Sequence, residues 1–140
     1  MLGRKTYTPE EIDSARGAVE QQLTAYRALA AVIAADSAPS ELPDGFEALY
    51  FNNMTIVLDR YFIHRIRPVT GKDSNPLNEV ELLSDSLMNN KGILRTGPVV
   101  KYVPEQTIVK QPVRDPIRLT AADFESLAAG FLAEVERRFS

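Results

Sequence analysis

The stretch GFEALYFNNMTIVLDRYFIHRIR, residues 45–67, limits what this chain can fold into. Asp44 followed by Glu47 is typical of a helix start, and Pro68 marks the point by which a helix must end. Twelve large apolar residues in this stretch point in every direction around a helical axis. Because an apolar helix must be covered on all sides, we predict that residues 45–67 form the central helix of the fold.

Three further helices are predicted from capping residues followed by apolar residues at helical spacing. They cover residues 8–36, 76–90 and 121–139, and each begins beside a capping residue: Thr8, Asn75 or Thr120. The first helix ends in ALAAVIAA, residues 28–35. We expect these alanine-rich last turns to be buried on several sides.

Residues 93–119 differ in character from the helical segments. Four prolines interrupt them, while VVKYV and TIVK have the β-branched content of strands. We predict a short β-hairpin over residues 99–110; the alternative is an extended arm that wraps the helices or a neighbouring subunit. The expected fold class is therefore mainly α, a four-helix bundle-like domain with a hairpin or arm before the last helix.

The composition is that of one ordinary globular domain, residues 1–140, with 44% hydrophobic and 25% charged residues. Because there is no cysteine, disulfides, thiolate nucleophiles and cysteine-ligated zinc are excluded. The N-terminus shows no apolar secretory signal, and the longest apolar run is far below the roughly 20 residues of a membrane-spanning helix. We expect a soluble cytoplasmic protein that needs no cofactor and contacts no membrane.

The third predicted helix is much shorter than the first two. Long helices beside a short one leave apolar surface uncovered in a monomer. We therefore expect a symmetric homodimer.

The net charge of −3 hides a segregation of charge along the chain. Residues 60–72 hold four Lys or Arg and no acid, and residues 91–118 hold six against two acids. Residues 37–59 and 73–90 each carry four acids and no Lys or Arg. We favour the interpretation that oppositely charged segments pack together; the alternative is a basic surface for an anion. Net acidity makes nucleic acid an improbable partner.

One polar stripe interrupts the predicted central helix. At 100° per residue, Asn53, Arg60, His64 and Arg67 fall within about 60° of one another. Asp59 lies on a flank of this stripe. A charge taken out of water must be paired, so the stripe faces a partner, a cavity or solvent.

In a purely structural interpretation, the arginines complement the negative end of the helix dipole. Arg60 then pairs with an acid of the third predicted helix, which offers Glu79, Glu81 and Asp85. We favour this interpretation, because ion pairs between packed helices are common.

In a functional interpretation, basic side chains of the stripe and of the following loop bind phosphate or carboxylate, together with the free N–H groups that open the third helix. The candidate binding residues are Asn53, Asp59, Arg60, His64, Arg67, Lys72 and Asn75. A metal site is not predicted, although Glu81 and Asp85 have the spacing of a magnesium or manganese pair.

The pair Arg60 and His64 resembles the motif of the helical, ribonuclease-like HEPN domains, in which an arginine precedes a histidine by a few residues. The spacing here is shorter than in that motif. The resemblance implies a hydrolytic enzyme in which His64 is the acid or base and arginines stabilise developing charge. We expect a dimeric, non-enzymatic binding or interaction module, with this enzyme as the alternative.

Three longer stretches carry a broader resemblance: MLGRKTYTPEEI, FNNMTIVLDRYFIHRIR and GKDSNPLNEVELLSDSLMNN. Together they resemble a family of small, conserved, uncharacterised bacterial proteins. The resemblance covers most of the chain and implies a cytosolic domain, but it brings no activity.

Overall fold

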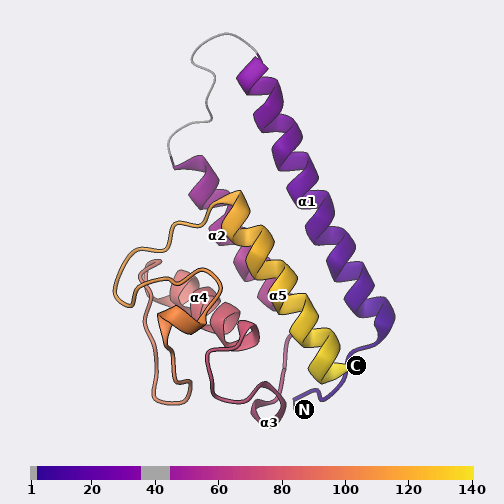
Figure 1. The fold of residues 1–140 in the computed structure, drawn as a ribbon, viewed down its shortest axis with the longest axis vertical. Helices are drawn as coiled ribbons and strands as arrows, with labels where there is room; N and C mark the ends of the chain where they lie inside the picture. The colour runs from indigo at the N-terminus through magenta and orange to yellow at the C-terminus, as the bar shows by residue number, and fades with distance from the viewer. Residues whose placement is uncertain (1–2, 36–44) are drawn as a thin grey trace.

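The computed structural model describes residues 3–35 and 45–140. The helices are α1 (Pro9–Ala35), α2 (Phe46–Arg60), α3 (Arg67–Thr70), α4 (Pro76–Asn89) and α5 (Ala121–Phe139), with a 3-10 helix, η1, at Pro104–Gln106 (Figure 1). The predicted mainly helical class is confirmed. Among the described residues, none of the helices has the length and apolarity that a membrane span requires.

Three long helices begin where the capping residues predict. In α1 the Glu11 N–H donates to Thr8 Oγ1 over 3.1 Å, and the Thr8 N–H donates to the Glu11 carboxylate over 2.9 Å. Asn75 Oδ1 accepts two N–H groups of the first turn of α4, and Thr120 with Asp123 forms a capping box on α5. Asp44, the predicted start signal of α2, lies outside the described residues.

The helix shared by the others is α5, not α2 as predicted. It packs against α1, α2 and α4, so its apolar side chains form the middle of the core (Figure 1). The buried residues of α5 are Ala121, Phe124, Leu127, Ala128, Phe131, Leu132, Val135 and Phe139. On α2, by contrast, Leu49 is 73% exposed. The prediction of a central α2 was wrong because the chain leaves the helix after Arg60, so the apolar residues of 45–67 do not surround one helical axis.

The second helix ends at Arg60, seven residues before the predicted end. The Tyr7 hydroxyl approaches the carbonyls of Phe62 and Ile63, at 3.1 and 2.8 Å, and its ring meets Phe62 edge-on at 5.0 Å. The Arg65 guanidinium also donates to the Phe62 carbonyl, over 2.9 Å. These groups take the carbonyls that a longer helix would have bonded within itself, so contacts distant in sequence set its end.

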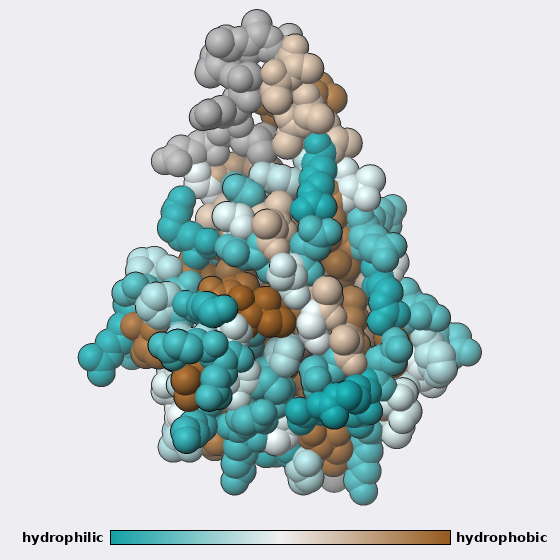
Figure 2. Space-filling model, in the orientation of Figure 1, coloured by the Kyte–Doolittle hydropathy of each residue, from teal (hydrophilic) through white to brown (hydrophobic). Residues whose placement is uncertain are grey.

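The last turns of α1 are exposed, which contradicts the predicted burial. Beyond Tyr26, no side chain of α1 is fully buried, and Leu29 and Val32 are 47% and 65% exposed. Figure 2 shows the weakly hydrophobic residues gathered at this end of the molecule. Because the Arg27 side chain already pairs with Glu125, near the start of α5, the rest of α1 extends past its neighbour.

Residues 93–119 form an extended arm, and the predicted hairpin is wrong. In the described residues the only β-type pairings are two isolated bridges, Arg4 with Arg65 and Ile93 with Pro116. The arm wraps the helices of its own chain, which was the alternative prediction (Figure 1). Its backbone is bound by polar side chains of α2, of α4 and of the turn before α4, and by backbone hydrogen bonds such as those that join Leu94 to Asp115 and Arg114.

The principal anchor of the arm is Glu79, which is completely buried on α4. Its two carboxylate oxygens accept the N–H groups of Ile108 and Val109, each over 2.9 Å. Burial raises the pKa of Glu79 above its ordinary 4.5, although these two N–H groups and the nearby Lys110 act to lower it. The carboxylate thus supplies acceptors that the apolar surroundings lack.

Replacing Glu79 with alanine is expected to lower the free energy of unfolding by about 2–5 kcal/mol, because two buried N–H groups lose their acceptors. The cost should depend on pH. The folded protein holds the Glu79 proton to a higher pH than the unfolded chain does, so the contribution of Glu79 is complete below about pH 4.5 and declines as the pH rises through the folded-state pKa. Urea unfolding of both proteins over a pH series measures this difference.

The matched control is Glu105→Ala, because Glu105 is an exposed carboxylate on the same arm. It should change stability by less than about 0.5 kcal/mol at every pH. A Glu79→Ala cost that grows as the pH rises from 4.5 to 8 would contradict the assignment.

Candidate functional site

The predicted polar stripe is not formed, because α2 ends at Arg60. The structure nevertheless brings three of the seven candidate residues together at one pocket. We call it the histidine pocket; its volume is about 240 Å³ and its lining residues are Asp59, Arg60, Ile63, His64, Arg65 and Glu81.

The N-terminal segment holds His64 in place. The backbone N–H of Arg4 donates to the His64 carbonyl, and the Arg4 carbonyl accepts the Ile66 N–H. These two hydrogen bonds fix the backbone at and after the histidine. The Arg4 guanidinium binds both oxygens of Glu11, over 2.8 and 2.9 Å, and lowers the pKa of Glu11 to about 2. His64 itself has a left-handed backbone, with φ of 66°, so its side chain leaves the turn at an angle that a helix would not give.

Both carboxylates of the histidine pocket are already paired. Asp59 binds the Arg65 guanidinium over 2.7 Å, and Glu81 binds that of Arg67 over 2.6 Å. The Arg65 side chain is only 6% exposed and stands over the Phe131 ring at 5.1 Å. Its Nε is buried and meets no acceptor in the described part of the chain.

Arg60 and His64 are the exposed basic groups of this pocket. Neither side chain donates to a carboxylate within residues 3–35 and 45–140, and the predicted pairing of Arg60 with an acid of α4 is not formed. Arg65 and Arg67 neutralise the two acids. The positive charge of Arg60 is therefore uncompensated in this pocket.

The other four candidate residues lie outside the pocket lining. Arg67 also donates to Asn78 Oδ1 over 2.8 Å and so ties α3 to α4. Asn75 is buried as the N-cap of α4, where its own side chain takes the N–H groups that we predicted for an anion. Asn53 and Lys72 are exposed. The predicted anion site at the start of α4 is therefore closed by the protein itself.

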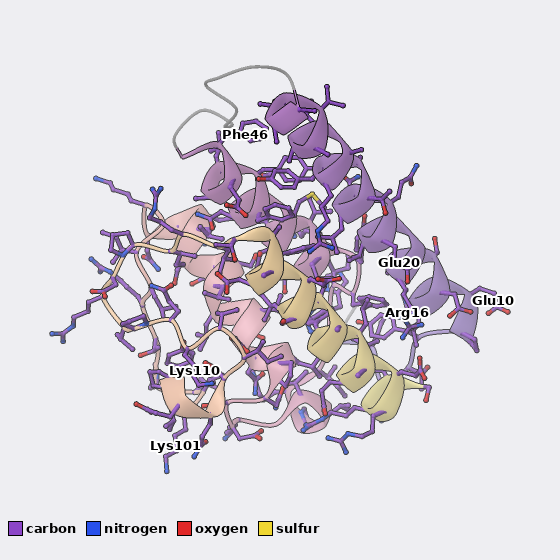
Figure 3. The ribbon with its side chains drawn as sticks, turned by 45° about the horizontal axis from the view of Figure 1, so that its top comes forward. Glu10, Arg16, Glu20, Phe46, Lys101 and Lys110 are labelled. Atoms are coloured by element: carbon purple, nitrogen blue, oxygen red, sulfur yellow. The ribbon has the colours of Figure 1, made fainter. Side chains whose placement is uncertain are left out.

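The basic segment 91–118 packs against the acidic segment 73–90, as the favoured interpretation predicts, because Ser74, Glu79 and Ser86 bind its backbone. Among the described residues, no ion pair involves any of its six cations, all of which are exposed. Figure 3 shows Lys101 and Lys110 on the arm, on the opposite side of the molecule from Glu10 and Glu20 of α1. The two segments thus meet through hydrogen bonds to the backbone of the basic segment, while its six cations stay unpaired in the described part of the chain and give this side a basic surface.

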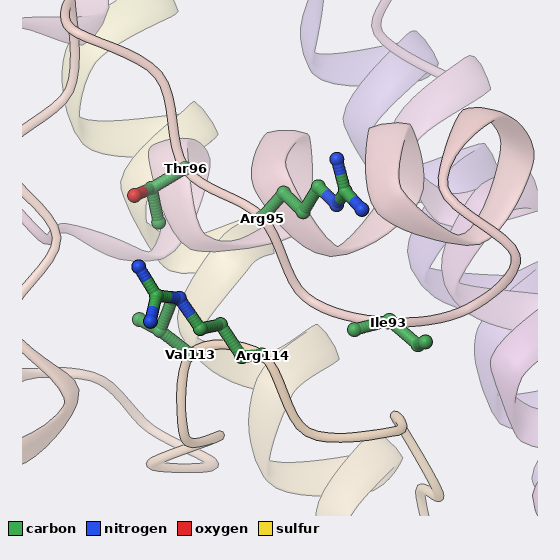
Figure 4. Close-up of a pocket in the computed structure, with 5 residues that line it drawn as sticks. All are labelled: Ile93, Arg95, Thr96, Val113 and Arg114. Atoms are coloured by element: carbon green, nitrogen blue, oxygen red, sulfur yellow. The ribbon is translucent and has the colours of Figure 1, made fainter.

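A second pocket lies on this basic side, and no candidate residue from the sequence lines it. We call it the arginine cavity; its volume is about 500 Å³ and its lining residues are Ile93, Arg95, Thr96, Val113 and Arg114 (Figure 4). The one feature of the sequence that could have indicated this pocket is the excess of basic residues in the arm. The spacing of nineteen residues between Arg95 and Arg114 gave no sign that they line one pocket.

Comparison with models of known protein families, with curated proteins and with solved structures finds no match. The resemblance noted from the sequence stays a prediction, and the functional argument rests on the geometry of the two pockets.

Gly3 is expected to be essential for holding the histidine turn. A Cβ atom at Gly3 would lie 2.9 Å from Ile66 Cβ and 3.2 Å from the His64 carbonyl oxygen, so Gly3→Ala should destabilise the protein by about 1–3 kcal/mol. Gly97→Ala is the matched control, because a Cβ there meets nothing within 4 Å. Thermal unfolding of both variants measures the effect. Equal stability of the two would show that the N-terminal segment does not hold the turn.

Proposed function

We propose that this protein is a binding module that takes a small anion in the histidine pocket. The observation that carries the proposal is the uncompensated charge of Arg60 beside His64, above carboxylates that other arginines neutralise. A phosphate or carboxylate group supplies the missing negative charge and accepts hydrogen bonds from both side chains.

The size of the pocket supports a small ligand. At about 240 Å³ it lies below the range of about 300–1,000 Å³ that is typical of pockets for larger organic molecules. The ion pair of Arg65 with Asp59 fixes the wall of the pocket, so this part of the site needs no ordering on binding. The proposed ligand is therefore an oxyanion or the anionic group of a small metabolite.

The alternative is a hydrolytic or HEPN-like nuclease that uses Arg60 and His64. In its favour, the two side chains line the same pocket despite their short spacing in the sequence. An acid–base histidine usually needs a carboxylate or carbonyl that orients its ring. In the described chain no such group accepts a hydrogen bond from the His64 ring, and Asp59 and Glu81 are held by arginines. This arrangement favours binding over catalysis.

Because His64 is the one histidine in the chain, its ring Hε1 proton gives a single NMR signal that reports on this pocket alone. Titration with inorganic phosphate should shift the His64 signal to saturation at constant pH. Arg60→Met should abolish the shift while changing the free energy of unfolding by less than about 0.5 kcal/mol, because Arg60 is exposed and pairs with no carboxylate within the described residues.

Lys72→Met is the control, because Lys72 belongs to the same basic segment but does not line the pocket. It should leave the titration unchanged. The same shift in wild type and Arg60→Met would contradict the site. RNA cleavage that disappears in His64→Ala would replace the binding function by the enzymatic one.

We also propose that two copies of the chain associate through the exposed apolar end of the molecule. Leu29 and Val32 of α1 and Leu49 of α2 are 47%, 65% and 73% exposed, and this end of both helices lies on the same side of the fold (Figure 1). Covering such side chains removes apolar surface from water, which supports association.

Val32→Glu is expected to convert a dimer into a monomer, since it places a charge in the apolar contact. Val99→Glu is the matched control, because Val99 is similarly exposed, at 51%, but lies on the arm. Light scattering coupled to size-exclusion chromatography gives the mass of each. A monomeric wild type, or a dimer that survives Val32→Glu, would rule out this contact.

A further inference from the structure

We infer that the arginine cavity is a second, independent binding site, and that it takes the diphosphate group of a small molecule. The first argument is charge. Arg95 and Arg114 line the cavity without a carboxylate among the lining residues, and neither forms an ion pair in the part of the chain that the structure describes. An anionic ligand would compensate both of these unpaired charges.

The second argument is that the backbone of both arginines is fixed. Ser86 on α4 accepts the Arg95 N–H over 3.0 Å, and its hydroxyl donates to the Arg95 carbonyl over 3.3 Å. The Arg114 N–H donates to the Leu94 carbonyl over 2.8 Å. The two arginines are therefore carried on adjoining, hydrogen-bonded segments, and a ligand has only their side chains to order.

The third argument is the backbone conformation of Arg114. Its φ of 75° lies in the left-handed region, where a residue with a side chain costs about 1–2 kcal/mol. Glycine would adopt this conformation without strain. Strained backbone conformations gather at functional sites. The strain at Arg114 therefore indicates that its side chain has a function at the cavity.

The arrangement of the side chains points to two anionic groups. In Figure 4, the Arg114 guanidinium lies on the side of Thr96, while the Arg95 side chain points away from it along α4. The two guanidinium groups are thus presented in different directions, and two linked phosphates offer one phosphate to each. Guanidinium binds phosphate through paired N–H groups, and the Thr96 hydroxyl adds a further donor.

The size and walls of the cavity favour a small molecule over a nucleic acid strand. Its volume of about 500 Å³ falls in the range of ligand pockets, and Ile93 and Val113 supply an apolar wall for the body of the ligand. No aromatic side chain is among the lining residues, whereas single-stranded nucleic acids are usually held by stacking on aromatic rings.

The test is isothermal titration calorimetry with pyrophosphate as the probe. Wild type should bind it saturably and at least about tenfold more tightly than orthophosphate, because the second phosphate engages the second arginine. Arg95→Met and Arg114→Gly should each weaken pyrophosphate binding by about tenfold or more. Arg118→Met is the matched control, an exposed arginine of the same arm outside the cavity lining, and should bind as wild type does.

Arg114→Gly also separates binding from folding. Since glycine suits a φ of 75°, this variant should keep or raise the melting temperature while it loses pyrophosphate. In the Arg60→Met background, which removes phosphate from the histidine pocket, pyrophosphate should still bind, and Arg95→Met and Arg114→Gly should still weaken it, so failure of the histidine pocket leaves this result intact. Three results would overturn the inference. The first is equal affinity for orthophosphate and pyrophosphate, and the second is an equal loss of affinity in Arg118→Met. The third is RNA binding that survives both cavity variants while pyrophosphate does not bind.

Discussion

The buried carboxylate of Glu79 is the interaction on which the basic side of this protein depends. An arm of residues 93–119 without a partner strand must satisfy its backbone groups in another way. Glu79, Ser74 and Ser86 do so from α4 and the turn before it, and Asn52 of α2 binds the last part of the arm through the Ile117 carbonyl and the Leu119 N–H. These polar residues are thus as much a part of the fold as the apolar core, and they hold the segments that carry both cavity arginines.

The sequence predicts best the features that depend on neighbouring residues. Thr8, Asn75 and Thr120 begin helices because a capping side chain binds N–H groups two or three positions ahead. The predicted helix 45–67 and the predicted hairpin went wrong because their outcomes depend on distant residues. Tyr7 approaches the carbonyls that end α2, and Glu79 takes the N–H groups that a hairpin would have used. The pattern of residues within either segment cannot predict these contacts, because the partners lie elsewhere in the sequence.

The same limit applies to the candidate site. The polar candidates from the sequence included Arg60 and His64, but the sequence could not separate them from Arg67 and Asp59, whose charges are paired with those of Glu81 and Arg65. The charge segregation in the sequence was real, yet its meaning depended on which cations find partners. In the structure the arginines of α1 pair with acids of α5, as Arg16 does with Glu136, while the cations of the arm form no such pairs among the described residues.

Backbone strain connects the two proposed sites. Four residues other than glycine have a left-handed backbone in the described chain, and every one is basic: His64, Lys91, Lys110 and Arg114. Lys91 is explained by its place just after α4, where such a conformation commonly closes a helix. His64 and Arg114 are different, because each lines a pocket and glycine would be the less strained choice. The left-handed backbone at His64 and Arg114 lowers the stability of the fold. Binding of an anion by their side chains at the two proposed sites is a physical reason for charged residues in place of glycine at these turns.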